Sequence, residues 1–342
     1  MQKVRAALTV LAVAASAVVV VGAGPAAADD EPALEAPTIS LVAPATLPRN
    51  TSTKILGTIT ATRPVPAGTL LAVTRTDPES PAGVALRPST VDAKGAFFIA
   101  DTMVSGGDLV YRVSYAGSDV LAPATATATI KVPLTPVRLS IEANPTTTPY
   151  NSGVSVTARL SNVAYPGGVI EIHADPYGPE PARRITLRTG QSSVQVRAVH
   201  SLSLTAKFLG TTRFAPTSAK TVVQTRVAVS TVSTRQYKTA NLGTVSYAHF
   251  RKTVHPYFTT TMTPYPHRKQ RLQFQVHSGG AWKPWKNVDL PLNTVGKSYY
   301  TLTGSHSTGV FYRVRAAYLP GTSGDSVNYT TYAPYKYFTF TK

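Results

Sequence analysis

The chain has 342 residues, a net charge of +18, 15% charged residues and 43% hydrophobic residues. This length suits two or three domains, and the hydrophobic fraction indicates packed cores rather than a disordered chain. The sequence contains no cysteine, which excludes disulfides, zinc or iron–sulfur centres with cysteine ligands, and thiol catalysis.

Residues 1–28 have the layout of a secretory signal peptide. A positively charged head precedes an uncharged run at residues 6–24, and Ala26–Ala28 supply small residues for cleavage. The alternative is a membrane-anchoring helix, because the apolar run is close to the minimum length that spans a bilayer. We expect cleavage, then a short acidic linker at residues 29–37, and a secreted chain with non-covalent cell-wall association left open.

The rest of the sequence is typical of β-strands. Apolar and polar residues alternate, as in Tyr111–Tyr115, where Tyr, Val and Tyr share one face. Turn residues separate such runs at about 8–12 residue intervals, which is typical of a β-sandwich. We predict an all-β chain of three tandem sandwich domains at residues 38–134, 135–229 and 230–342, with boundaries at proline-rich joints.

Internal repeats support three copies of one unit. The motif Tyr115-x-Gly117-x5-Pro123 recurs as Phe208-x-Gly210-x5-Pro216. A hairpin-type turn precedes each strand end, at Asp92-x-x-Gly95, Arg188–Gly190 and Asn293-x-x-Gly296. Glycines at these places allow positive φ in tight turns, so the motifs indicate folding chemistry.

On these motifs, residues 38–228 resemble the tandem bacterial immunoglobulin-like (Ig-like) repeat domains of secreted actinobacterial proteins. The third unit departs from the pattern, since it lacks the Gly-x5-Pro spacing, and its Tyr312–Arg315 segment is similar to related C-terminal Ig-like modules. The resemblance implies Ig-like sandwiches and an extracellular spacer, adhesion or binding role. It carries over no catalytic residue.

Charge and aromatic residues concentrate in the last third of the chain. Net charge is +2 for residues 38–134, +6 for residues 135–229 and +12 for residues 230–342, and the last segment holds 20 of the 29 aromatic residues. A cationic face with few acids attracts polyanions. The alternative is a solvated basic surface that only keeps the protein soluble.

We predict that the third domain contacts an anionic cell-wall polymer, an acidic polysaccharide, anionic lipid headgroups or a surface protein. Extracellular DNA stays open as an anionic polymer, and no specific nucleic-acid partner is expected. The candidate polyanion-binding residues are the basic side chains Arg251, Lys252, Arg268, Lys269, Arg271, Lys283, Lys286, Arg313 and Arg315.

Aromatic side chains offer an alternative, in which the third domain binds a neutral glycan by stacking. The candidates are Trp285, Trp282 and Tyr299. Trp282 aligns with alternating strand residues, which favours a core position. The tyrosines near the C-terminus are interpreted as a final strand with its loop.

Catalytic motifs are missing from the sequence. It has no Gly-x-Ser-x-Gly and no His-Glu-x-x-His, and its third domain has only two carboxylates, Asp289 and Asp325. Asp325 lies in a Gly-Asp-Ser turn, where a structural role is expected. We therefore expect no enzyme activity, no catalytic residue, no metal and no cofactor, with a hydrolase of uncommon constellation as the remaining alternative.

Overall fold

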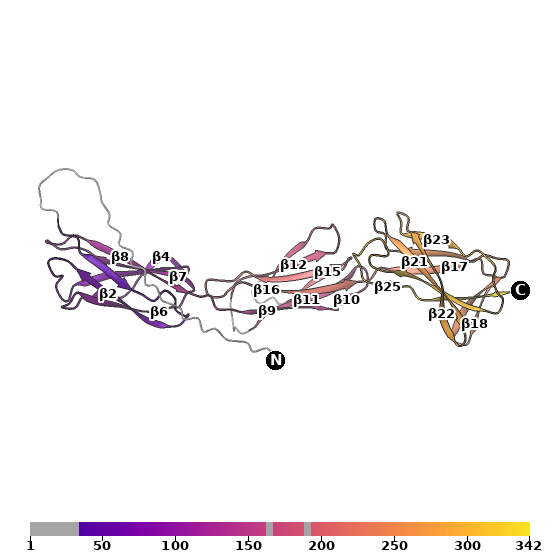
Figure 1. Ribbon diagram of the computed structural model, residues 1–342, viewed down its shortest axis with the longest axis horizontal. Coiled ribbons are helices and arrows are strands. Elements are labelled where there is room, and N and C mark those ends of the chain that lie inside the picture. The colour runs from indigo at the N-terminus through magenta and orange to yellow at the C-terminus, as the bar shows by residue number, and fades with distance from the viewer. Residues whose placement is uncertain (1–33, 162–166, 188–192) are drawn as a thin grey trace, which may run out of the picture. The chain divides into compact units, whose positions relative to one another are not determined.

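The protein is described by a computed structural model covering residues 34–161, 167–187 and 193–342 (Figure 1). The predicted signal peptide, most of the linker and the predicted turn at Arg188–Gly190 lie outside these residues. The described residues form strands, turns and loops, and they contain no helix that could span a membrane. The predicted all-β class is confirmed.

The first sandwich packs two sheets around one hydrophobic core that includes Ile55, Leu71 and Tyr111. One sheet has the order β1-β2-β6 and the other β4-β3-β7-β8, with β5 beside β3. The strands are β1 (Thr38–Val42), β2 (Ser52–Thr60), β3 (Leu70–Asp77), β4 (Ser80–Ala85), β5 (Ser89–Thr90), β6 (Ala96–Thr102), β7 (Gly107–Tyr115) and β8 (Ala124–Val132).

The second sandwich has a separate core, which includes Val154, Ile172 and Leu204. Its sheets have the orders β14-β11-β9 and β10-β16-β15-β12-β13. The strands are β9 (Arg138–Asn144), β10 (Thr147–Thr148), β11 (Ser152–Ser161), β12 (Ile170–Pro176), β13 (Arg183–Leu187), β14 (Ser193–Ala198), β15 (Leu202–Phe208) and β16 (Thr217–Thr225).

The third sandwich has a core rich in aromatic residues, including Phe258, Phe274 and Phe338. Its sheets have the orders β17-β20-β23 and β18-β19-β26-β24-β21-β22, with β25 beside β24. The strands are β17 (Val229–Thr234), β18 (Lys238–Leu242), β19 (Val245–Arg251), β20 (Tyr257–Met262), β21 (Lys269–Ser278), β22 (Ala281–Pro291), β23 (Lys297–Thr301), β24 (Phe311–Tyr318), β25 (Thr331–Tyr332) and β26 (Lys336–Thr341).

The three sandwiches share one strand plan. The sheet β1-β2-β6 corresponds to β9-β11-β14 and to β17-β20-β23, and β4-β3-β7-β8 corresponds to β13-β12-β15-β16 and to β22-β21-β24-β26. In an immunoglobulin constant domain, the fourth strand joins the sheet opposite to that of the third strand. Here the corresponding strands β4, β13 and β22 pair with β3, β12 and β21 in the same sheet. The sandwiches are therefore Ig-like with this one strand placed differently.

The third sandwich carries an insertion that sequence reasoning missed. The two-residue strand β10 pairs in parallel with β16 in the second sandwich, and the full strand β19 pairs in parallel with β26 in the third. Strand β18 adds to β19 as a hairpin. The insertion widens the larger sheet and accounts for part of the extra length of residues 230–342.

The repeated glycine motifs occupy equivalent places. Gly117 has a φ of 91° and Gly210 a φ of 83°. A Cβ atom on either would lie 3.0–3.1 Å from the carbonyl oxygen four residues ahead and 3.1 Å from the nitrogen of the proline that ends the motif. The predicted repeat is therefore a shared backbone bend that leaves no room for a side chain.

By contacts between Cα atoms, the described chain divides into two compact units. One contains the first sandwich and the segment Gly210–Pro216, and the other contains the second and third sandwiches. Within the first unit, Arg213 and Glu79 form an ion pair with both carboxylate oxygens engaged, at 2.6 and 2.8 Å. The hydrogen bond from Arg213 is the main cause that lowers the pKa of Glu79 to about 2.

We expect the third sandwich to lose stability as the pH falls from about 7 to about 5. Burial is the main cause that lowers the pKa of His249 and His306, with added repulsion from Lys238 and His255 respectively. The unfolded chain therefore binds these protons more tightly, so this stability is fully present above about pH 6.5 and falls as the pH drops toward the lowered folded values.

Both tryptophans of the sequence, Trp282 and Trp285, belong to the third sandwich, so intrinsic tryptophan fluorescence isolates its thermal unfolding. The variant His306→Phe should flatten the dependence of the midpoint on pH. An unfolding midpoint that stays constant over this range in the parent chain would contradict the expectation.

Candidate functional site

The outer face of the larger sheet in the third sandwich gathers arginine and aromatic side chains. Along β24, Tyr312, Val314 and Ala316 are buried, and Arg313 and Arg315 point to the other face. The register places Arg313 opposite Gln275 and Arg315 opposite Gln273 on β21. The two arginines therefore lie on one strand face, opposite Tyr312 and Val314.

Three aromatic rings alternate with the two guanidinium groups. The Cζ atom of Arg313 lies 4.6 Å from the ring centroid of Trp282 and 3.9 Å from that of Tyr335. The Cζ atom of Arg315 lies 4.7 Å from Tyr335 and 3.8 Å from Tyr332. We call this alternating row (Tyr332, Arg315, Tyr335, Arg313, Trp282) the ladder.

Hydrogen bonds fix the orientation of both guanidinium groups. Arg313 Nε donates to Gln275 Oε1 at 2.7 Å, and Arg315 Nε donates to Gln273 Oε1 at 2.9 Å. Among the described residues, no carboxylate lies within ion-pair distance of either guanidinium, and neither donates a hydrogen bond from its Nη atoms. Each arginine therefore presents a preorganised pair of Nη donors of the kind that binds carboxylate or phosphate.

Both aspartates of residues 230–342 are already paired with other arginines, so neither neutralises the ladder. Asp289 accepts two hydrogen bonds from Arg271, at 2.7 and 2.8 Å, and the hydrogen bond from Arg271 is the main cause that lowers the pKa of Asp289. Asp325 pairs with Arg268. Residues 230–342 contain fourteen lysines and arginines but only these two aspartates.

The other predicted basic residues are distributed more widely. Arg271 lies on the same sheet face as the ladder, but Asp289 occupies its guanidinium. Arg251 lies at the end of β19, where its Cζ atom is 4.6 Å from the ring centroid of Tyr237 and its Nη1 donates to the backbone oxygen of Lys342. The remaining exposed candidates, at strand ends or on the edge strand β22, are Lys252, Lys269, Lys283 and Lys286.

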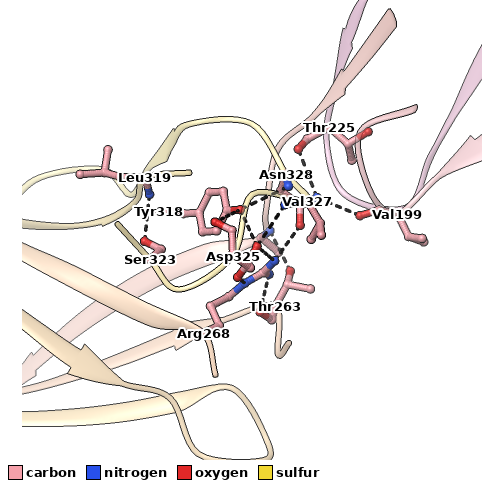
Figure 2. A network of polar contacts seen from close by, with 11 residues as sticks. Val199, Thr225, Thr263, Arg268, Tyr318, Leu319, Ser323, Asp325, Val327 and Asn328 are labelled. Atoms are coloured by element: carbon pink, nitrogen blue, oxygen red, sulfur yellow. Dashed lines mark hydrogen bonds and ion pairs between the residues drawn. The ribbon is translucent and has the colours of Figure 1, made fainter. Parts of the chain in front are cut away.

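Arg268 is not a surface residue, so its prediction as a polyanion-binding candidate is wrong. Its side chain is fully buried, and its Nε and Nη2 donate to the two carboxylate oxygens of Asp325 at 2.7 and 2.9 Å. Nη2 also donates to Asn328 Oδ1, and Nη1 donates to the backbone oxygen of Thr263 (Figure 2). Buried charges are retained only when paired in this way.

The Arg268 network joins the second and third sandwiches. Asn328 Nδ2 donates to the backbone oxygens of Val199 and Thr225, which belong to the second sandwich (Figure 2). Burial opposes the ionisation of Asp325, but hydrogen bonds from Arg268 and Tyr318 outweigh it and lower the pKa of Asp325. The structural role expected for Asp325 is confirmed, and its partner Arg268 lies 57 residues earlier in the chain.

The three predicted stacking residues do not come together. The core position favoured for Trp282 is wrong, since its ring lies half-buried on the outer face of the sheet with Arg313 over it. Trp285 lies at a bulge in the β21–β22 pairing and is 43% exposed, but its ring centroid is 4.9 Å from that of Tyr312. Tyr299 is 50% exposed, lies on the smaller sheet and stacks with Tyr257. No shared platform for a neutral sugar results.

The aromatic residues that complete the site are Tyr332 and Tyr335, which sequence reasoning interpreted only as a final strand and loop. They lie at β25 and in the turn before β26, and they reach β24 because β25 and β26 both pair with it. The spacing of the tyrosines and arginines along the chain does not indicate this arrangement.

In the part of the chain that the structure describes, the closest histidine pair is not accompanied by further metal ligands. His255 Nδ1 lies 3.2 Å from His306 Nε2, and the His306 ring stacks on Phe340. Among the described residues, no three histidine or carboxylate side chains gather as metal ligands. The expectations of no enzyme activity, no metal and no cofactor stay predictions.

Comparison with protein families and with curated proteins gives no match. Among solved structures, native E. coli alpha-2-macroglobulin is similar over 87% of this chain and 22% of its own, with 11% identity and a TM-score of 0.24. A Salmonella alpha-2-macroglobulin mutant is similar over 90% and 24%, with 9% identity and a TM-score of 0.22. The chain thus spans about a quarter of the macroglobulin chains.

The FN1–FN3 domains of chicken CNTN1 are similar over 90% of this chain and 99% of their own, with 10% identity and a TM-score of 0.23. A chain of fibronectin-type domains is thus among the structural neighbours. The assignment of Ig-like sandwiches rests on the sheets described above.

Proposed function

We propose that this chain is an exported, non-catalytic protein of tandem Ig-like sandwiches whose third sandwich binds an anionic cell-surface polymer. The observation that carries the proposal is the ladder, in which Arg313 and Arg315 are held side by side with unpaired Nη donors. The first two sandwiches act as spacers. The bacterial Ig-like repeat type and export through residues 1–28 are parts of the same proposal.

Charge supports a polyanion over a neutral glycan. A net charge of +12 on residues 230–342 favours polymers that release counterions on binding. Stacking on a neutral sugar needs free ring faces, and Trp282 and Tyr299 each have a face covered by a neighbouring side chain. A surface protein partner would have to present an acidic patch to the same donors.

The proposal predicts that binding to cell-wall sacculi depends on both polymer charge and salt. The full chain should bind sacculi that retain their anionic polymers at about 50 mM salt and should be released at about 500 mM salt. Sacculi stripped of anionic polymer should bind little. Binding that survives high salt would favour the neutral-glycan alternative, and no binding at low salt would leave the basic surface as a solubility feature.

A further inference from the structure

A groove lies directly beside the ladder and shares a residue with it. It has a volume of about 500 Å³ and runs between β17, the β18–β19 hairpin and the start of β26, and clefts of this size commonly hold small ligands. Tyr335, the central ring of the ladder, also lines the groove. The two features therefore meet at Tyr335.

The chemistry of the groove differs from that of the ladder. Five uncharged hydrogen-bonding side chains line it, namely Ser233, Gln236, Thr239, Thr244 and Ser246. Lys336 is its one charged lining residue, and Val232 and Ala248 add apolar surface. Hydroxyl and amide groups of this kind suit a ligand that is itself rich in hydroxyl groups.

The ladder sets the spacing of the charges that it can bind. Both guanidinium carbons contact the same Tyr335 ring, at 3.9 and 4.7 Å from its centroid, so they lie no more than about 8.6 Å apart. Because Gln275 and Gln273 occupy the Nε atoms, only the Nη pairs remain for a two-oxygen anion. Two such anions on neighbouring units of a chain would engage both arginines.

We propose that the ladder and the groove together bind an acidic polysaccharide, a chain of hydroxyl-bearing sugar units that carry carboxylates. The carboxylates bind to Arg313 and Arg315, and neighbouring sugar units lie in the groove beyond Tyr335. This inference rests on the proposed function and names its ligand class. An acidic peptide lacks the hydroxyl groups, and a polyphosphate lacks both hydroxyl groups and rings.

Calorimetric titration of the full chain tests the inference with polygalacturonate oligomers at about 50 mM salt. Three other polymers serve as comparison ligands. Methyl-esterified polygalacturonate lacks the negative charge, polyglutamate has carboxylates but no hydroxyl groups, and polyphosphate has phosphates in place of carboxylates. We expect polygalacturonate to bind at least about tenfold more tightly than each of the other three, since charge-assisted hydrogen bonds and groove contacts both contribute.

Variants locate the binding. Arg313→Gln with Arg315→Gln should weaken polygalacturonate binding about 100-fold, and the two arginine-to-lysine changes should weaken it about tenfold because the planar fork is lost. The matched control, Lys207→Gln with Lys220→Gln, removes two exposed charges from the second sandwich and should have less than about a threefold effect. Thr239→Val with Ser246→Ala should weaken polygalacturonate about tenfold and leave polyglutamate unchanged.

Fluorescence melts of each variant confirm that it is folded at the assay temperature. Equal affinity for polyglutamate or polyphosphate, lost in the ladder variants, would overturn the polysaccharide inference while the proposed function stands. Unchanged affinity in the ladder variants would also overturn it. Failure of every polymer and of sacculi at low salt would overturn both.

Discussion

Replacing Arg268 with alanine is expected to destabilise the third sandwich by about 3–5 kcal/mol, because Asp325 would remain buried without its partner. Arg268 is the largest fully buried side chain, and the side chain of Asp325 is only 5% exposed. Urea unfolding followed by tryptophan fluorescence measures the loss, since both tryptophans lie in this sandwich. The Asn328 contacts to the second sandwich should weaken with it.

A matched control is provided by the second ion pair of the same sandwich. Arg271 and Asp289 have nearly the same two-contact geometry, but their side chains are 27% and 42% exposed. Because exposed pairs contribute little, Arg271→Ala should cost no more than about 1 kcal/mol. Equal losses for the two variants would show that burial does not set the strength of the Arg268 pair.

The second large effect is expected for Gly296→Ala. Gly296 has a φ of 74°, and a Cβ atom there would lie 2.1 Å from the backbone oxygen of Met262 and 3.2 Å from the Cδ atom of Pro264. An alanine at this position must keep a left-handed backbone conformation. The neighbouring backbone must also shift to make room for its methyl group. We expect a loss of about 3 kcal/mol or more, again measured by tryptophan fluorescence in urea.

Gly309→Ala separates the cost of the left-handed backbone conformation from the cost of the close contact with Met262. Gly309 has a φ of 76°, nearly the same as that of Gly296, but a Cβ atom there would have no other atom within 4 Å. Its substitution should cost only the conformational term, about 1–2 kcal/mol. A loss as large as that for Gly296 would mean that backbone conformation, and not the contact with Met262, explains the effect.

Local patterns were enough to predict the fold class, because strand alternation and turn glycines are properties of neighbouring residues. The turn glycines Gly95 and Gly296 both have positive φ, and each is preceded by an acceptor side chain. Asp92 Oδ1 accepts from the backbone nitrogens of Lys94 and Ala96, and Asn293 Oδ1 accepts from those of Val295 and Lys297. The two turns thus repeat the same chemistry, as their spacing predicted. The prediction of hairpins is wrong, because each turn joins strands of opposite sheets, β5 to β6 and β22 to β23.

The functional surface could not be predicted in the same way, because it depends on contacts between distant segments. Arg268 lies in a basic run that is typical of an exposed patch, and only Asp325, 57 residues further along, explains its burial. The ladder likewise combines residues of β22, β24 and the segments around β25. The concentration of charge and aromatic residues in the third domain was visible, but their order along one sheet face was not.

The dependence of binding on salt shows whether Arg313 and Arg315 bind an anionic polymer. For the full chain and a polygalacturonate oligomer, the logarithm of the association constant should fall linearly with the logarithm of the salt concentration, with the slope set by the number of ion contacts. Arg313→Gln with Arg315→Gln should reduce the magnitude of that slope by about two, and Lys207→Gln with Lys220→Gln should change it by much less. An unchanged slope in the ladder variant, or no salt dependence in the parent chain, would contradict the claim that this row of arginines binds the anionic polymer.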